Sequence, residues 1–421
     1  RANTLRLALS GQLGVVPRAA SANGNGPVPT DFHTSAFAAS TIVTVDNVLP
    51  GTWDDAALEA VKDALDLCVS CKGCKRDCPT GVDMAKMKIE FLHHYKLRYG
   101  FTWKDKLIAR LPDYAAQASR FAGVLNLRNS SPWMAQLGEK VLGLAARRKL
   151  PVWEARPFFK QAPVTATREQ VLAAARPVVL FVDTFNGYFE SINARAALKV
   201  LQAAGYTVHV ATKLRPDGKH LCCGRTYLTS GMVDEARAKA GEVIESLSPF
   251  ALKDIPIVGL EPSCLLTLRD EMLSMGLGPD AQAVARHAFL LEEFLAREAT
   301  AGRLEELKGK LRPLDQRVLL HGHCHQKAFA AVPPIVDVLR LIPGVQPEVI
   351  EGSCCGMAGS FGYEAGHYEV SMQMAELTLL PAVRKYPGAI VVADGTSCRH
   401  QIQDGAQREA VHAAVLLAAQ L

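Results

Sequence analysis

The chain has 421 residues, of which 49% are hydrophobic, and its formal net charge is +5. The chain is too long to fold around one compact core, so two or three domains are expected. The mild charge excludes nucleic-acid binding as the default function, and no apolar stretch reaches the roughly 18 residues of a membrane-spanning helix.

The chain starts at Arg1 and shows no signal peptide, so we expect its numbering to begin inside a longer polypeptide. Its eleven cysteines gather in tight motifs within a large, core-rich chain. This pattern favours metal ligation in a reducing compartment over disulfides. We therefore expect a cytoplasmic protein, with peripheral contact at a membrane as an alternative.

Residues 1–50 are predicted to be a linker that continues from a missing upstream region. The stretch from Ser21 to Pro50 is rich in Ala, Ser, Gly, Asn and Pro and lacks helical periodicity. Residues 51–160 are predicted to form a helical, ferredoxin-like iron–sulfur domain.

Two helices are expected to flank the first cysteine run, Cys68 to Cys78. The pattern from Asp54 to Leu67 is helical, and Asp83 is placed to cap a second helix. The apolar positions of that second helix are Met84, Met87, Phe91, Leu92 and Tyr95.

The first run has the spacing Cys-x2-Cys-x2-Cys-x3-Cys-Pro of bacterial ferredoxins, which predicts a [4Fe-4S] cluster. Its cysteines are Cys68, Cys71, Cys74 and Cys78, and Pro79 follows. Gly73 permits a close backbone approach to the inorganic sulfides. The charges of Lys72, Lys75 and Arg76 are expected to offset the negative charge of the cluster.

Two alternatives fit this run less well. Structural zinc sites usually pair two Cys-x2-Cys knuckles a dozen or more residues apart, and a redox-active dithiol would leave two cysteines without a role. His93 and His94, on the following helix, are interpreted as surface or packing residues.

The stretch from Phe101 to Lys160 is basic. It holds eleven Lys or Arg against four Asp or Glu, a surplus of +7 that leaves the rest of the chain at −2. Apolar residues interleave at roughly helical spacing, among them Trp103 and Trp133. Two interpretations stay open, a solvated face over a small core and a docking surface for an acidic partner or anionic lipid.

After Pro177, short apolar strands alternate with helices in an order that occurs twice, which indicates an internal repeat. The alternation predicts α/β units with small parallel sheets, over 177–312 and 313–421. The strands expected in the first copy are 178–182, 207–211 and 256–260, with helices at 191–204 and up to 247. The strands expected in the second copy are 318–321, 347–350 and 389–393, with helices around 335–341 and up to 383.

Each copy carries two adjacent cysteines and a glycine after a predicted strand, and another cysteine about 40 residues later. Ligands in open α/β sheets bind beyond the carboxyl ends of the strands, so the thiolates of the second copy should converge on one crevice. The cysteines concerned are Cys222, Cys223 and Cys264 in the first copy, and Cys324, Cys354, Cys355 and Cys398 in the second.

These motifs resemble the tandem cysteine-rich CCG domains of heterodisulfide-reductase and glycolate-oxidase iron–sulfur subunits. With the ferredoxin-type run and the opening Arg1 to Gly11, the whole chain is similar to the carboxyl-terminal half of FAD-linked D-2-hydroxy-acid dehydrogenases acting on D-2-hydroxyglutarate or D-lactate. The resemblance implies that FAD binds an upstream domain, not this chain. It also implies that a first ferredoxin motif lies upstream, so that Cys78 would serve a second cluster with it.

The chain departs from the pattern that the resemblance implies. Gly395 replaces one late cysteine in the second copy, where four cysteines remain. In the first copy no cysteine lies near Thr184, and Glu261 replaces another. The second copy is therefore expected to bind a [4Fe-4S] cluster. The first is interpreted as a buried relic, with a cluster held by Cys222, Cys223 and Cys264 that leaves one iron open as the alternative.

Two further features of the second copy have modest interpretations. His321, His323 and His325 alternate around Cys324 and are interpreted as packing residues, with proton or quinone chemistry as the alternative. The glycines from Gly356 to Gly362 miss the dinucleotide and P-loop spacings, and close backbone approach to cluster sulfur explains them more simply.

Three functions are compatible with these motifs. The first is an oxidoreductase part that relays electrons from an upstream flavin domain to an acceptor such as a quinone or a carrier protein. The second is a reductase subunit whose CCG cluster reduces a disulfide or a quinone. The third is a structural zinc-binding module.

Overall fold

The computed structural model describes residues 55–161, 165–212, 220–352 and 354–421, so the predicted linker over 1–50 lies outside the described residues. The amino-terminal part is helical, as predicted. Its elements are α2 (Asp55–Asp66), α3 (Gly73–Asp77), α4 (Met84–Tyr99), α5 (Trp103–Ala109), α6 (Leu111–Ala118), η2 (Ser119–Phe121), α7 (Ala122–Asn126), η3 (Leu127–Asn129), α8 (Pro132–Leu142), η4 (Phe158–Lys160) and α9 (Arg168–Leu172).

Helices α2 and α4 hold the first cysteine run between them. The Asp83 carboxylate accepts hydrogen bonds from the backbone N–H groups of Ala85 and Lys86, which confirms the predicted cap of α4. The two helices share a small buried cluster of apolar side chains. Its members are Leu58, Val61, Leu65, Met84, Phe91 and Leu92.

The first repeat forms a four-stranded, all-parallel sheet in the order β2-β1-β3-β4. Its strands are β1 (Pro177–Phe181), β2 (Thr207–Val210), β3 (Ile257–Gly259) and β4 (Ala288–Leu290). Its helices are α10 (Thr184–Tyr188), α11 (Ser191–Ala203), α12 (Arg225–Thr229), α13 (Val233–Ala251), α14 (Pro262–Arg269), η5 (Glu271–Ser274), α15 (Pro279–His287), α16 (Leu291–Thr300) and α17 (Glu305–Lys310).

The second repeat forms another all-parallel sheet, in the equivalent order β6-β5-β7-β8. Its strands are β5 (Val318–Leu320), β6 (Pro347–Val349), β7 (Ile390–Val392) and β8 (Ala410–Val411). Its helices are α18 (Cys324–Ala328), α19 (Val332–Leu339), η6 (Phe361–Tyr363), η7 (Ala365–His367), α20 (Tyr368–Glu376), α21 (Leu379–Lys385), α22 (Thr396–Ala406) and α23 (Ala413–Ala419).

The predicted α/β fold with small parallel sheets is confirmed, and the two sheets share one strand order. The six predicted strands match β1, β2, β3, β5, β6 and β7. Strands β4 and β8 were not predicted, because β4 runs directly into α16 and β8 is followed by α23 after one residue, so their apolar residues resemble the start of those helices. The predicted domain boundaries at 160, 177 and 312 stay predictions.

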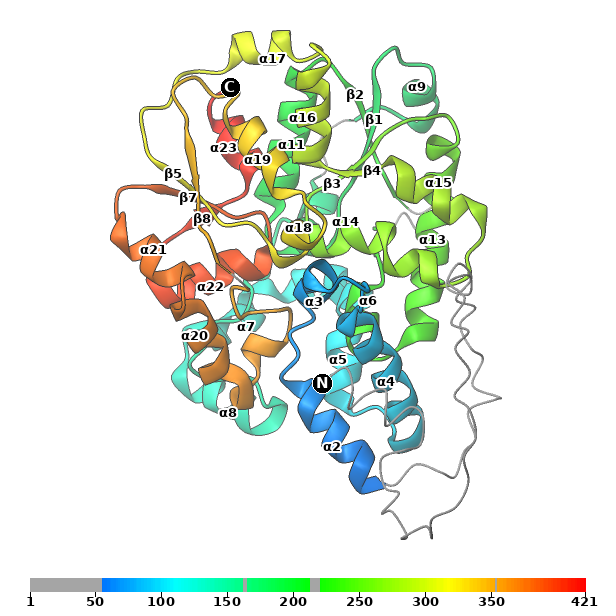
Figure 1. The fold of residues 1–421 in the computed structure, drawn as a ribbon, viewed down its shortest axis with the longest axis vertical. Coiled ribbons are helices and arrows are strands. Elements are labelled where there is room, and N and C mark those ends of the chain that lie inside the picture. The colour runs from blue at the N-terminus through cyan, green and yellow to red at the C-terminus, as the bar shows by residue number, and fades with distance from the viewer. Residues whose placement is uncertain (1–54, 162–164, 213–219, 353) are drawn as a thin grey trace, which may run out of the picture.

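The repeats pack face to face. Figure 1 shows α11, α16, α19 and α23 between the two sheets, and their side chains join both sheets in one buried core. On the outer faces, α13 and α15 cover the first sheet, and α21 and α22 cover the second. Strand residues alternate between these cores, so that Leu180 points inward and Val179 outward, as expected for parallel strands buried on both faces.

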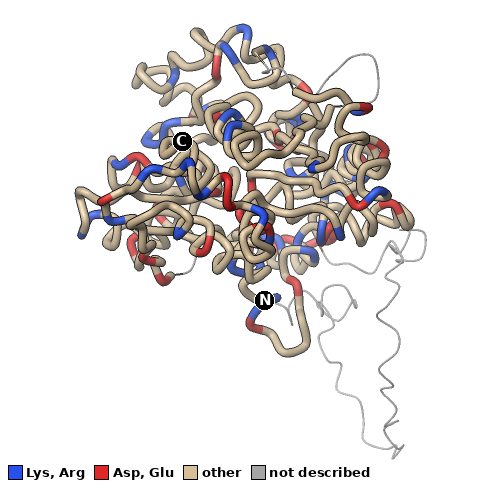
Figure 2. The backbone as a smooth tube through the Cα atoms, turned by 90° about the horizontal axis from the view of Figure 1, so that it is seen from above, with Lys and Arg blue, Asp and Glu red and all other residues tan. Residues whose placement is uncertain are grey.

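The basic segment lies against the second repeat. Arg148 is buried, and its guanidinium donates to Gln401 and to Asp404, while Lys104 pairs with Glu364 and Arg147 with Glu369. Part of the +7 surplus is therefore neutralised within the chain. Seen from above in Figure 2, residues of both signs are interspersed. Among the described residues, no helix is long and apolar enough to cross a membrane.

Candidate metal centres

The cysteines of the second repeat follow its strands at the carboxyl edge of the sheet. Cys324 begins α18 just after β5, Cys398 lies in the first turn of α22 after β7, and Cys354 and Cys355 follow β6. Strands β5 and β7 are neighbours whose connections leave in opposite directions, which creates the crevice where open α/β sheets bind ligands.

His321, Cys355 and Cys398 form one buried group, with ligand atoms within 4.8 Å of one another. His321 is 2% exposed, and its imidazole lies beside the Cys355 thiol. An imidazole beside two thiols is a donor set that suits a soft metal. Sequence reasoning treated His321 as a packing residue, because only its position at the end of β5 reveals this contact.

Hydrogen bonds between the thiols join the four cysteines of this repeat. Bonds from Cys354 and Cys398 hold the pKa of Cys355 well below its ordinary value, and a bond to Cys324 raises that of Cys354. Cys355 is therefore poised as a thiolate, the form that binds metal. The structure brings the four predicted cysteines together, and their role as ligands stays a prediction.

The glycines of this site contact the protein backbone. Gly356 has φ 85°, and a Cβ there would meet the Ser371 carbonyl oxygen of α20 at 2.2 Å. The close approach at Gly356 is thus made to α20, and an approach of these glycines to cluster sulfur stays a prediction. A Cβ on Gly395 would meet the His323 ring at 2.4 Å, so this ring fills the space beside the position where a cysteine was expected.

The cysteines of the first repeat are differently paired. A hydrogen bond from Cys222 lowers the pKa of Cys223. A hydrogen bond to Cys264 and burial raise this pKa more strongly, so that it lies well above its ordinary value. Cys222 and Cys264 also have raised pKa values. Glu261 accepts a hydrogen bond from the Thr396 amide of the second repeat at 2.9 Å, so its carboxylate joins the two repeats. These thiols are buried and neutral.

The ferredoxin-type loop, residues 68–78, has an unusual backbone conformation. Ser70 and Lys72 have φ of 49° and 58°, in the left-handed region that non-glycine residues seldom adopt. The Met84 amide donates to Cys74 Sγ at 3.4 Å. The Cys78 Sγ lies 3.1 Å from the Thr80 hydroxyl, on the outer side of the loop.

The basic side chains of the loop do not offset the charge of a cluster as simply as we expected, because all three pair with acidic side chains. Lys72 pairs with three carboxylates, Lys75 with Asp270, and Arg76 with the adjacent Asp77. Their charges are thus largely neutralised by neighbouring acids. The interpretation of the two following histidines agrees with the structure, since His93 contacts the Gly231 carbonyl and His94 contacts Glu90.

The ferredoxin-type loop lies against the start of α18 in the second repeat, which carries Cys324 and His325. Burial raises the pKa of Cys71, and the nearby Cys324 raises it further. The His325 ring lies 3.2 Å from the Ser70 carbonyl oxygen. Two cysteine groups that are far apart in the sequence are thereby neighbours in the fold.

Residues 188–269 match the cysteine-rich domain family, CCG. The chain is 26% identical over 354 residues to D-2-hydroxyglutarate dehydrogenase of Escherichia coli (strain K12), which covers 82% of this chain and 33% of that protein. It is 28% identical over 303 residues to a subunit of the anaerobic glycerol-3-phosphate dehydrogenase of the same organism, covering 71% of this chain and 72% of that subunit. The chain thus spans about one third of the length of the D-2-hydroxyglutarate dehydrogenases that it matches.

The chain therefore carries a CCG cysteine-rich domain, and its similarity to these dehydrogenases is consistent with the iron–sulfur half of FAD-linked dehydrogenases.

Proposed function

We propose that this chain is the iron–sulfur electron-transfer portion of a flavin-dependent D-2-hydroxy-acid dehydrogenase. Its partners would be a flavin domain, upstream in the same polypeptide or separate, and an acceptor such as a quinone or a carrier protein. The observation that carries the proposal is the contact of His325, which follows Cys324, with the Ser70 carbonyl oxygen, which precedes Cys71. The similarity to two kinds of dehydrogenase supports it.

In this proposal Cys68, Cys71 and Cys74 hold one [4Fe-4S] cluster and Cys78 belongs to another. The second repeat holds a cluster through Cys324, Cys354, Cys355 and Cys398. Such clusters supply one-electron transfer. The chain supplies thiolates at fixed positions, and in the second repeat it removes most of them from water.

The cysteines of the first repeat hold no cluster in this proposal. This repeat retains only Cys222, Cys223 and Cys264, one thiol fewer than the four that a [4Fe-4S] cluster uses. The carboxylate of Glu261, which replaces a cysteine, is already engaged with Thr396.

Peripheral contact with an anionic membrane is part of the proposal. Trp133, Leu137 and Val141 follow one another at the i, i+4 spacing of one face of α8, and all three are exposed, with Trp133 at 66%. Phe121, just before α7, is 64% exposed. Exposed basic side chains lie nearby in the sequence, so anionic lipid is the complementary partner. They include Lys106, Arg110, Arg120, Lys140 and Lys149.

The function is tested by anaerobic reduction of the whole chain after reconstitution with iron and sulfide. We expect reduced free flavin to bleach its visible absorption, and a water-soluble quinone to restore it. A protein that binds iron and sulfide but accepts no electron from reduced flavin would contradict the proposal.

A further inference from the structure

Lys72, between two cysteines of the ferredoxin-type loop, is buried in a group of acidic side chains. Only 1% of its surface is exposed. Its Nζ lies 3.0 Å from Asp83, 2.7 Å from Asp270 and 2.9 Å from Glu271. A buried ammonium group is stable only when carboxylates pair with it. These three carboxylates therefore fix the position of Lys72 and of the loop that carries it.

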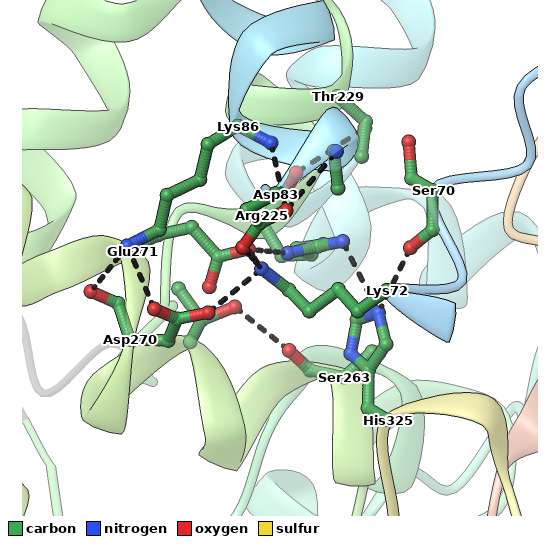
Figure 3. Close-up of polar contacts among 12 residues, drawn as sticks. Ser70, Lys72, Asp83, Lys86, Arg225, Thr229, Ser263, Asp270, Glu271 and His325 are labelled. Atoms are coloured by element: carbon green, nitrogen blue, oxygen red, sulfur yellow. Dashed lines mark hydrogen bonds and ion pairs between the residues drawn. The ribbon is translucent and has the colours of Figure 1, made fainter. Parts of the chain in front are cut away.

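Asp270, at the end of α14 in the first repeat, is the centre of this group (Figure 3). Its carboxylate also contacts Lys75 Nζ at 2.9 Å and Lys86 Nζ at 2.7 Å. One carboxylate thus binds three ammonium groups from the loop and from α4. Burial opposes its ionisation, but the adjacent Lys72 and then the other lysines hold the pKa of Asp270 well below its ordinary value.

A second arm of contacts reaches the other repeat. Glu271 accepts a hydrogen bond from Arg225, whose guanidinium lies beside His325. His325 in turn contacts the Ser70 carbonyl oxygen. Figure 3 shows these side chains converging on the loop from both repeats. The loop is therefore held between the repeats by polar contacts on each side of Cys71.

We propose that Asp270 is a positioning residue that fixes the ferredoxin-type loop against the start of α18, which carries Cys324 and His325. Among the described residues Asp270 is the carboxylate that pairs with all three ammonium groups, and Lys72 is almost fully buried. The loss of its charge would leave excess positive charge buried under the loop and would push the loop away from Cys324. The consequence for electron transfer rests on the proposed function, whereas the positioning itself does not.

Hydrogen exchange on the whole chain without clusters tests the positioning directly. In Asp270→Asn we expect the amides of residues 69–76 to exchange at least about tenfold faster than in the wild type. Asp280→Asn, which removes an exposed carboxylate in the same repeat, is the matched control and should leave these amides unchanged. Asp270→Glu should restore most of the protection. Unchanged exchange in Asp270→Asn would overturn the proposal.

Two further measurements keep the test decisive. If Asp270→Asn fails to fold, Lys75→Gln removes the loop's own partly exposed contact to the same carboxylate. It should speed exchange of the same amides while those of β1 stay protected, and unchanged exchange in residues 69–76 would overturn the proposal.

In the reconstituted, fully reduced protein, Asp270→Asn should weaken the magnetic interaction between clusters, as seen by electron paramagnetic resonance, and Asp270→Glu should retain it. A chain that binds no iron would contradict the proposed function and leave the exchange result valid.

Discussion

The ring of His325 lies 3.2 Å from the carbonyl oxygen of Ser70. His325 follows Cys324 directly, and Ser70 directly precedes Cys71. Each partner is thus one residue from a predicted cluster ligand. A side chain at the start of α18 and the backbone of the ferredoxin-type loop therefore join the two candidate cluster sites.

Replacing Cys355 with Ser should lower the iron content of the reconstituted whole chain by about one [4Fe-4S] cluster. Cys355 is the thiol with the depressed pKa and lies in the group with His321 and Cys398. Cys223→Ser, in the first repeat, is the matched control and should leave the iron content unchanged. Equal losses from the two variants would mean that the first repeat also holds a cluster.

Replacing Cys78 with Ala should leave iron bound at Cys68, Cys71 and Cys74. In two-cluster ferredoxins the fourth cysteine of the run ligates the other cluster, and here the Cys78 thiol contacts Thr80. We expect the iron at this loop to be oxygen-labile and substoichiometric in this chain, and unchanged by the substitution. A stable four-iron cluster that disappears in Cys78→Ala would show that the four cysteines close one cluster.

Glu190→Gln should destabilise the chain by about 3 kcal/mol at pH 7, as is typical when one partner of a buried pair is removed. Glu190 of the first repeat accepts hydrogen bonds from Arg399 at 2.8 Å and from Thr396 at 2.6 Å, both in the second repeat. Urea unfolding measures the difference. Glu305→Gln, at an exposed ion pair with Lys308, should change stability by less than about 1 kcal/mol.

The ion pair between Glu190 and Arg399 also makes the stability of the chain depend on pH. Burial opposes the charge of Glu190, but Arg399 lowers its pKa from 4.5 to about 2. Because the folded pKa is depressed, this stabilisation is complete above the unfolded pKa near 4.5 and is lost as pH falls through about 2. The stability difference between wild type and Glu190→Gln should therefore shrink from pH 5 to pH 2. A difference that stays constant over this range would refute the assigned pairing.

Trp133→Ser should weaken cosedimentation with vesicles that contain phosphatidylserine. Leu252→Ser replaces a side chain of the same exposure, 65%, in the first repeat and serves as the control. Binding should be absent with neutral phosphatidylcholine vesicles and should be released at about 0.5 M salt, where charges are screened within a few ångströms. Failure of the wild type to bind anionic vesicles at low salt would remove the membrane contact from the proposed function.

The sequence predicts the strands because parallel strands buried on both faces form uninterrupted apolar runs, as in Val178 to Phe181. It predicts the cysteine group of the second repeat because those cysteines follow strand ends. It cannot predict the contact of Lys72 with Asp270, since the partners are 198 residues apart and nothing local selects one acid over another. The place of His321 beside Cys355 depends in the same way on how two strands and a loop meet.

The most direct test of the central claim is the iron and acid-labile sulfide content of the whole chain, purified anaerobically, in the wild type and in Cys71→Ser and Cys324→Ser. We predict iron and sulfide in equal amounts in the wild type. Each variant should lose part of the iron, and the double variant should lose the sum of the two losses. Bound zinc without sulfide, or iron that neither substitution reduces, would contradict the assignment of iron–sulfur clusters to this chain.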